Sequence, residues 1–134
     1  MCRLCRRELL AALGLILVAP ARAEAARFAA EAERMRREAV AAGDQSYGAV
    51  LVKDGAIVGW GPSRVVVDRN PDAHAERVAM WDAERRLGRA ALAGAQLYST
   101  STPCADCQAW AVTVGVARMH VGAEARDAGA PRRR

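Results

Sequence analysis

The sequence predicts an α/β fold in which helices cover a mixed β-sheet. Short β-branched or apolar runs alternate along the chain with longer Ala-rich segments that are typical of helices. An Asp54-Gly55 pair separates the first two apolar runs, which indicates a β-hairpin. The 134 residues show no internal repeat and provide one domain with a modest core.

The first half of the predicted fold is a helix followed by two strands. Residues 24–42 are rich in Ala, Glu and Arg, and they predict a helix that ends at Gly43. Residues 47–53 and 56–60 are the two apolar runs, and they predict the paired strands of the hairpin.

The second half predicts helices alternating with shorter strands. An Asn70-Pro71 turn precedes a predicted helix over residues 73–87, which Gly88 ends. Residues 96–99 predict a strand that leads into a helix over residues 103–114, and residues 118–121 predict a last short strand. Residues 122–134 show neither a helix nor a strand pattern.

Two short motifs carry the chemistry of the chain. His74-Ala75-Glu76 is followed, twenty-eight residues after Glu76, by Cys104, which pairs with Cys107 in a Pro-Cys-x-x-Cys run. One imidazole and two thiolates give zinc three protein ligands and leave the fourth tetrahedral position open for water, as in catalytic sites. Glu76 is then expected to act as general acid and base rather than as a ligand.

The spacing of these residues suits the tips of two helices. Cys104 and Cys107 share a helical face, with Pro103 expected at the first helical position and Thr102 as the cap. The positive end of this helix is expected to favour thiolate over thiol. His74 and Glu76 are expected to converge on the metal from the tip of the preceding helix.

Each motif alone has other interpretations. An isolated His-x-Glu arises by chance, and an isolated Cys-x-x-Cys is also found in structural zinc sites and redox pairs. Their occurrence together, in this order and after a predicted strand, favours the catalytic zinc site.

The first twenty-three residues have the pattern of an export signal. Arg3, Arg6 and Arg7 form a basic start, and residues 9–19 form an unbroken apolar run of eleven, too short to span a bilayer. Ala21-Arg22-Ala23 offers a cleavage site. We therefore predict a signal peptide over 1–23, a domain with the catalytic zinc site over 24–122 and a disordered basic tail over 123–134.

The predicted location follows from this signal. The paired Arg6 and Arg7 resemble a twin-arginine signal, and a periplasmic or secreted protein is expected. The alternatives are a misassigned start codon or an ordinary N-terminal helix, which would leave the protein cytoplasmic.

The charge of the chain does not indicate a nucleic-acid-binding surface. The formal net charge is +5, but residues 1–23 hold four arginines and one glutamate, which leaves +2 for the rest. Arg132, Arg133 and Arg134 supply three of these positive charges, so the body of the domain is close to neutral.

From Tyr47 to Val121 the chain resembles the cytidine deaminase-like superfamily, in its CMP/dCMP-type zinc deaminase branch. That branch includes guanine deaminase, tRNA adenosine deaminase and deoxycytidylate deaminase. The resemblance rests on three parts of the sequence. The first hairpin is similar in Tyr47-Gly48-Ala49-Val50 with Val52-Lys53-Asp54-Gly55, the first zinc motif in Asn70-Pro71-Asp72-Ala73-His74-Ala75-Glu76, and the strand before the cysteines in Leu97-Tyr98-Ser99-Thr100. The resemblance implies a three-layer α/β/α fold that here lacks the last strand and the C-terminal helix, because residues 122–134 carry no pattern.

The resemblance also implies roles for site residues. His74, Cys104 and Cys107 would bind zinc, Glu76 would move protons, and Tyr47 and Ala75 would lie near the base. Ser63 occupies the position, eleven residues before His74, at which purine-acting members carry a base-binding Asn. The shorter hydroxyl of Ser63 puts that contact in doubt.

The sequence therefore predicts a zinc-dependent hydrolytic deaminase of a nucleobase, nucleoside or nucleotide that releases ammonia. Two alternatives stay open: a catalytically inactive zinc-binding scaffold, which the expected loss of C-terminal elements favours, and a tRNA adenosine deaminase. The neutral body and the export signal make a nucleic-acid substrate the less expected one. We expect a small-molecule substrate, no stable membrane span and a homodimer.

Overall fold

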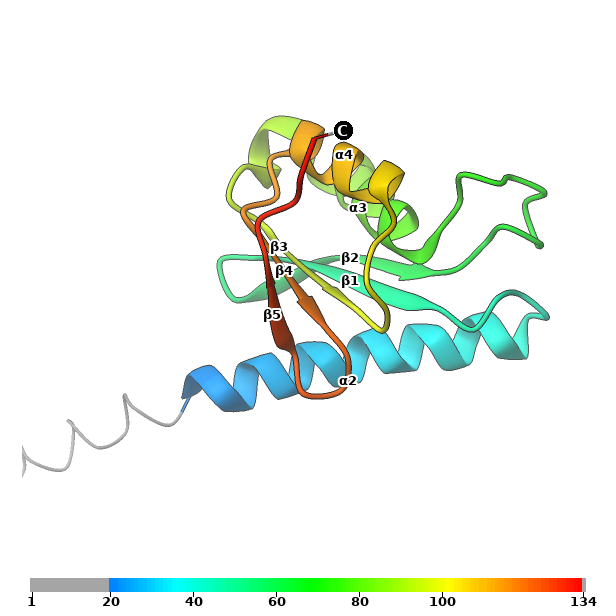
Figure 1. Cartoon of the computed structure of the whole chain (residues 1–134), viewed down its shortest axis with the longest axis horizontal. Helices are drawn as coiled ribbons and strands as arrows, with labels where there is room; N and C mark the ends of the chain where they lie inside the picture. The colour runs from blue at the N-terminus through cyan, green and yellow to red at the C-terminus, as the bar shows by residue number, and fades with distance from the viewer. Residues whose placement is uncertain (1–19, 134) are drawn as a thin grey trace, which may run out of the picture.

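The computed structural model describes residues 20–133, which form a five-stranded mixed sheet with helices on both faces (Figure 1). The strand order is β2-β1-β3-β4-β5, in which β3 and β4 run parallel and the other neighbours run antiparallel. The elements in chain order are α2 (Pro20–Ala41), β1 (Gly48–Lys53), β2 (Ala56–Pro62), α3 (Ala75–Leu87), the 3₁₀ helix η1 (Arg89–Leu92), β3 (Gln96–Ser99), α4 (Ala105–Val114), β4 (Arg118–Val121) and β5 (Arg126–Gly129).

The layers follow from the alternation of side chains along the strands. Val50 packs with Phe28 and Met35 of α2 on one face of the sheet. Its neighbour Leu51 points to the opposite face, where it packs with Met80 of α3. Figure 1 shows α2 beneath the sheet and α3 and α4 above it, which confirms the predicted three-layer α/β/α arrangement.

The predicted hairpin is confirmed. Asp54 and Gly55 join β1 to β2 with φ angles of 51° and 76°, the left-handed conformation that a tight two-residue turn requires at both positions. The hairpin places the end of β2 beside the start of β1, so that the segments flanking these strands meet at one end of the sheet.

Two glycines of β2 allow α3 to pack directly on the strand. A Cβ atom on Gly61 would lie 2.1 Å from the carbonyl oxygen of Ala75, and one on Gly59 would lie 2.1 Å from that of Ala79. No side chain fits in these gaps, so the backbones of α3 and β2 touch. This contact fixes the position of the first turn of α3, which carries Glu76 and follows His74.

Strand β2 lies at an edge of the sheet, and the carboxylate of Asp82 covers part of that edge. Asp82 accepts a 3.0 Å hydrogen bond from the backbone N–H of Trp60 and also pairs with Arg85 at 2.5 Å and Arg86 at 3.0 Å. Its side chain is 8% exposed, so three donors satisfy a nearly buried charge. Two residues further along the edge, Pro62 has no N–H to offer.

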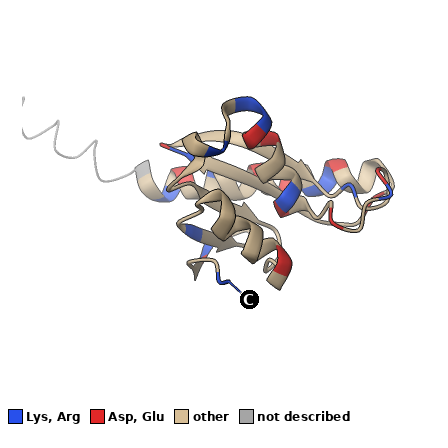
Figure 2. Cartoon of the chain, turned by 90° about the horizontal axis from the view of Figure 1, so that it is seen from above, with Lys and Arg blue, Asp and Glu red and all other residues tan. Residues whose placement is uncertain are grey.

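Basic and acidic residues are interspersed over the surface (Figure 2). On α2, Arg34 pairs with Glu31 and Glu38 at the helical spacings of three and four residues. Figure 2 shows both basic and acidic residues on α2 and on the loop after β2, so neither segment carries charges of one sign alone.

The prediction for residues 122–134 is wrong, because residues 126–129 form β5. This strand pairs with β4 through a tight connection, with Val121 opposite Arg126, and an ion pair of 2.6 Å joins Arg118 to Asp127. The last strand is therefore present, and a basic tail that is disordered from residue 123 onward is not what the structure shows. No helix follows β5 within the residues that the structure describes.

The predicted signal peptide falls mainly on residues 1–19, which lie outside the described residues. Helix α2 begins at Pro20 rather than at residue 24, so the proposed cleavage site at Ala23 lies within its first turn. Among the helices described, none is both long and apolar enough to cross a membrane.

Candidate metal centre

The metal centre lies between the N-termini of α3 and α4. His74 is the N-cap residue of α3 and Cys104 is the N-cap residue of α4, each with an extended backbone. The predicted helix starts at residues 73 and 103, and the predicted capping role of Thr102, are therefore wrong. The sulfur of Cys104 itself accepts a 3.4 Å hydrogen bond from the N–H of Cys107, so this cysteine caps the helix that carries its partner.

The distances between the three predicted ligand atoms suit tetrahedral zinc. Nδ1 of His74 lies 3.6 Å from Sγ of Cys104 and 3.5 Å from Sγ of Cys107. Zn–S bonds of about 2.3 Å and a Zn–N bond of about 2.0–2.1 Å at tetrahedral angles place nitrogen and sulfur about 3.6 Å apart. All three ligand atoms lie within 4.8 Å of one another, so one ion can contact all of them.

Without metal, the surroundings of Cys107 favour the neutral thiol. Burial and the Glu76 carboxylate raise the pKa of Cys107 to about 12, although a hydrogen bond from Arg77 opposes this shift. The expectation that the helix terminus would favour the thiolate is therefore wrong for Cys107, because burial outweighs it. A divalent cation reverses the balance, since a coordinating thiol is deprotonated.

Glu76 lies beside the three ligands and is held by Ser99. Its side chain is buried, and Oε1 accepts a 2.7 Å hydrogen bond from the Ser99 hydroxyl at the end of β3. The carboxylate also lines the cavity that His74 and Cys104 border. Glu76 is therefore placed to contact a molecule at the metal while its orientation is fixed from the sheet.

Arg77 interacts with Cys107 at the metal centre. Its side chain is 12% exposed and forms an ion pair of 3.1 Å with Asp72. Burial alone would lower the pKa of Arg77, but Cys107 and Asp72 raise it overall. The sequence does not predict this role of Arg77. The residue follows Glu76 in the chain, and its position there does not indicate a contact with the sulfur of Cys107, thirty residues away.

A cavity of about 290 Å³ opens beside the ligands. This volume lies near the lower end of the roughly 300–1,000 Å³ typical of small-molecule sites. Three segments line it: the α2–β1 connection, the start of α3 and the β3–α4 connection. The lining residues are Gln45, Tyr47, His74, Glu76, Ser101, Thr102 and Cys104.

Of the three predicted substrate-binding residues, only Tyr47 lines the cavity. Ala75 is fully buried between His74 and Glu76. Ser63 does not line the cavity: it is 2% exposed, and its hydroxyl donates a 2.9 Å hydrogen bond to Asp44. Gln45 is a lining residue that sequence analysis did not identify.

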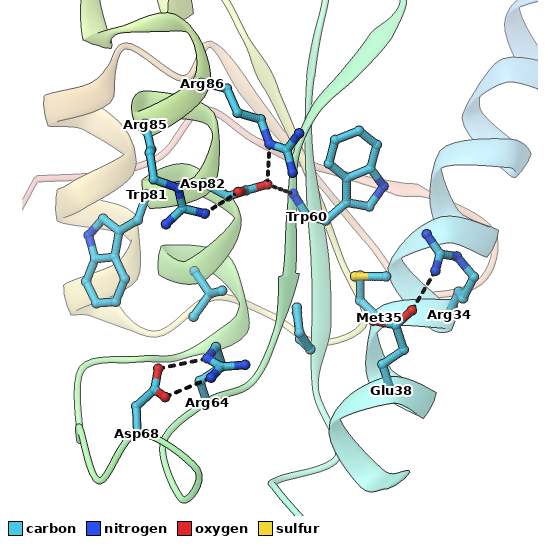
Figure 3. Close-up of a pocket in the computed structure, with 12 residues that line it drawn as sticks. Arg34, Met35, Glu38, Trp60, Arg64, Asp68, Trp81, Asp82, Arg85 and Arg86 are labelled. Atoms are coloured by element: carbon cyan, nitrogen blue, oxygen red, sulfur yellow. Dashed lines mark hydrogen bonds and ion pairs between the residues drawn. The ribbon is translucent and has the colours of Figure 1, made fainter. Parts of the chain in front are cut away.

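A second and larger cavity of about 710 Å³ lies between α2, β2 and α3, and contains none of the metal-binding residues. Figure 3 shows its charged side chains paired with one another, Arg64 with Asp68 and Arg34 with Glu38. Asp82 and its two arginines lie at the same cavity. Since these charges neutralise each other, the smaller cavity at the ligands is the candidate site.

Residues 22–123 match the family model described as "Cytidine and deoxycytidylate deaminase zinc-binding region". The match contains both motifs, with the three ligands His74, Cys104 and Cys107, and it also contains Glu76 and its hydrogen-bond partner Ser99.

Similar proteins carry two different activities in their names. The chain is 38% identical over 80 residues to a tRNA-specific adenosine deaminase of Aquifex aeolicus, covering 60% of this chain and 53% of that protein. It is 43% identical over 61 residues to a guanine deaminase of Bacillus subtilis, covering 46% of this chain and 39% of that protein. The chain thus spans about half the length of these curated relatives or less.

Solved structures of the same kinds share the fold. The X-ray structure of guanine deaminase from Bacillus subtilis has a TM-score of 0.66 and 33% identity, covering 72% of this chain and 62% of that chain. A structure from a study of A-to-I editing by tRNA:A34 deaminases has a TM-score of 0.67 and 32% identity, covering 71% of this chain and 73% of that chain.

Proposed function

Since this chain belongs to the family of the cytidine and deoxycytidylate deaminase zinc-binding region, we propose that it is a zinc-dependent hydrolytic deaminase of a nucleobase, nucleoside or nucleotide. Water adds to an amidine-type ring carbon, the bond from that carbon to the exocyclic nitrogen breaks, and ammonia leaves. The observation that carries the proposal is the arrangement of His74, Cys104 and Cys107 at zinc-binding distances, with a carboxylate beside them in the same cavity.

His74, Cys104 and Cys107 would hold zinc, which would supply the Lewis acidity that makes water a better nucleophile. Glu76 would accept one proton from the attacking water and pass it to the ring nitrogen, and it would then carry the remaining hydroxyl proton to the exocyclic nitrogen as ammonia leaves. The bond from Ser99 keeps Oε1 of the carboxylate in place during these transfers. His74 presents Nδ1 to both sulfurs, so its Nε2 carries the proton in the neutral ligand.

A small-molecule substrate is supported by the size of the cavity and by the interspersed surface charges. A base presented by tRNA is the second candidate, and the tRNA-specific adenosine deaminases among the relatives favour it. The two candidate substrates require different surfaces. A tRNA needs a basic surface outside the cavity that contacts its phosphates, whereas a small molecule needs only the cavity.

Ammonia release by the zinc-loaded protein tests the proposal. The panel contains cytosine, guanine, adenine, their nucleosides, deoxycytidylate and a tRNA anticodon stem-loop with adenosine in the loop. We expect turnover of at least one of the small molecules, and no turnover by Cys104→Ser protein. Turnover of the stem-loop alone would establish the second candidate, and no turnover of any compound at full zinc occupancy would favour the inactive scaffold.

We further propose that the protein is exported, as residues 1–23 predict. Sequencing the N-terminus of the protein recovered from its native host tests this. Cleavage after Ala23 is the expected result, and an intact Met1 on protein from the cytoplasm would contradict export.

A further inference from the structure

We propose that Gln45 recognises the substrate by pairing its side-chain amide with the edge of the base. This inference rests on the proposed deaminase function and names a residue that sets its specificity. The ligand class is a heterocyclic base with an acceptor and a donor side by side, on an edge other than the one that carries the leaving amine.

The amide of Gln45 is available at the cavity. Gln45 lines the cavity together with His74 and Glu76, and its side chain makes no hydrogen bond within the described residues. The other glutamines behave differently: Gln96 bonds to His120, and Gln108 bonds to the carbonyl oxygen of Pro103. Among the glutamines of the described residues, Gln45 is therefore the one that lines the candidate site and has a side-chain amide without a hydrogen bond.

The backbone of Gln45 is fixed although its side chain is free. The N–H of Gln45 donates to Asp44 at 2.8 Å, and the carbonyl oxygen of Gln45 accepts from the N–H of Tyr47 at 2.8 Å. A fixed backbone limits the directions in which the side chain points, which lowers the entropy lost when the amide binds a ligand.

Asp44 extends this support to the loop that follows β2. Its carboxylate accepts hydrogen bonds from the hydroxyl of Ser63 at 2.9 Å and from the N–H groups of Val66 and Val67 at 2.9 and 2.7 Å. Burial raises the pKa of Asp44, but these bonds and the one from Gln45 lower it overall, so the carboxylate is charged at neutral pH. The segment carrying Gln45 is thus tied to a second part of the chain.

The chemistry of the remaining walls favours the amide as the group that recognises the base. Tyr47, Ser101 and Thr102 each offer one hydroxyl, whereas an amide presents an acceptor and donors in one plane. Planar amides pair with base edges through two parallel hydrogen bonds. Ser63 does not provide such a contact, because it lies outside the cavity lining and its hydroxyl donates to Asp44.

The test compares four zinc-loaded full-length proteins: the unaltered chain, Gln45→Ala, Gln45→Glu and the control Gln96→Ala. Gln45→Glu keeps the shape of the side chain but removes both amide donors. The ratio kcat/KM is measured by ammonia release for cytosine, guanine, adenine, their nucleosides, deoxycytidylate and the tRNA anticodon stem-loop. Binding of the same compounds is measured by calorimetry with each protein also carrying Glu76→Gln, so that binding is seen without turnover.

We expect both Gln45 variants to lose about 10- to 100-fold in kcat/KM for the preferred base, mainly through KM, and to discriminate less between bases. Affinity in the Glu76→Gln background should fall by the same factor, and Gln96→Ala should match the unaltered chain. Turnover and affinity unchanged by Gln45→Ala would overturn the role of Gln45 while leaving the deaminase function intact. If no compound is turned over and none binds, both proposals fail, whereas binding that depends on Gln45 without turnover would retain the recognition role alone.

Discussion

The hydroxyl of Ser99 donates a 2.7 Å hydrogen bond to Oε1 of Glu76, although the two residues lie 23 positions apart on β3 and α3. Both side chains are buried. The bond connects the carboxylate proposed to move protons to the central part of the sheet, while α3 supplies its backbone. The orientation of Glu76 therefore depends on the packing of a helix against a strand and on a single hydroxyl group.

Replacing Ser99 by Ala should lower kcat about tenfold with little change in KM or zinc content. The carboxylate loses the partner that orients it, and misplacement of a reacting group costs rate more than binding. Steady-state kinetics at matched zinc occupancy measure the effect. Thr113→Ala is the control, because it removes a hydroxyl that bonds to the carbonyl oxygen of Ala109 near the C-terminal end of α4, outside the cavity lining. An unchanged kcat would show that Ser99 does not position Glu76.

Replacing Glu76 by Gln should abolish most turnover while retaining zinc and fold. General acid and base catalysis contributes about 10² to 10⁴ in rate, and a group used in several proton transfers is expected at the upper end. Ammonia release on the best substrate and metal analysis of the same sample are the two measurements. Loss of zinc together with activity would instead identify Glu76 as a ligand.

Replacing Cys104 or Cys107 by Ser should remove most of the bound zinc. Partners behind the ligands change metal affinity by about 10- to 100-fold, and loss of a ligand should exceed that range. Metal analysis after dialysis against a weak chelator measures the retained zinc. Thr113→Ala, on the same helix as Cys107, is the control and should keep one zinc per chain. Full occupancy in the Cys107→Ser protein would contradict the ligand assignment.

Zinc affinity should increase with pH through the neutral range. The pKa of Cys107 is raised to about 12 in the metal-free protein, so this thiol is protonated at pH 7 and must lose its proton when zinc binds. Each unit of pH below about 12 therefore weakens binding by about tenfold through this group alone. Calorimetry in buffers of different ionisation enthalpy should show at least one proton released per zinc. Heats that do not depend on the buffer would contradict this coupling.

Replacing Gly61 by Ala should destabilise the zinc-loaded protein. The added Cβ would meet the carbonyl oxygen of Ala75 at 2.1 Å, and backbone atoms cannot move aside as a flexible side chain does. Overpacking costs about 1–3 kcal/mol, and this site is expected at the upper end. Urea denaturation measures the free energy of unfolding. An unchanged midpoint would mean that α3 can shift away from β2 at no cost.

The ligands could be predicted from the sequence because their chemistry is carried by short motifs. His74, Cys104 and Cys107 are recognisable by residue type and order, and the structure brings them together. The helix starts were misplaced because Thr102 is a common capping residue, whereas here a cysteine sulfur takes that role. That choice depends on the position of the whole metal centre, which local propensity does not encode.

The residues around the ligands were harder to predict because they act through tertiary contacts. Gln45 precedes a strand in sequence, and only the closure of the α2–β1 connection onto the start of α3 brings it to the cavity. Strand β5 consists of Arg, Asp, Ala and Gly, none of which favours strands, and its pairing with β4 overrides that preference. Ser63 was assigned by its position in the chain, but its hydroxyl is used by Asp44.

The covering of the β2 edge by Asp82 limits how two copies of this chain can associate. Continuous pairing of β2 with a neighbouring molecule would require the Trp60 N–H to leave Asp82, which would take one of three donors from a nearly buried carboxylate. The same pairing would meet Pro62, which contributes no hydrogen bond. Extension of the sheet through β2 is therefore disfavoured, and we expect the predicted homodimer to form through helix faces, loops or the opposite edge of the sheet.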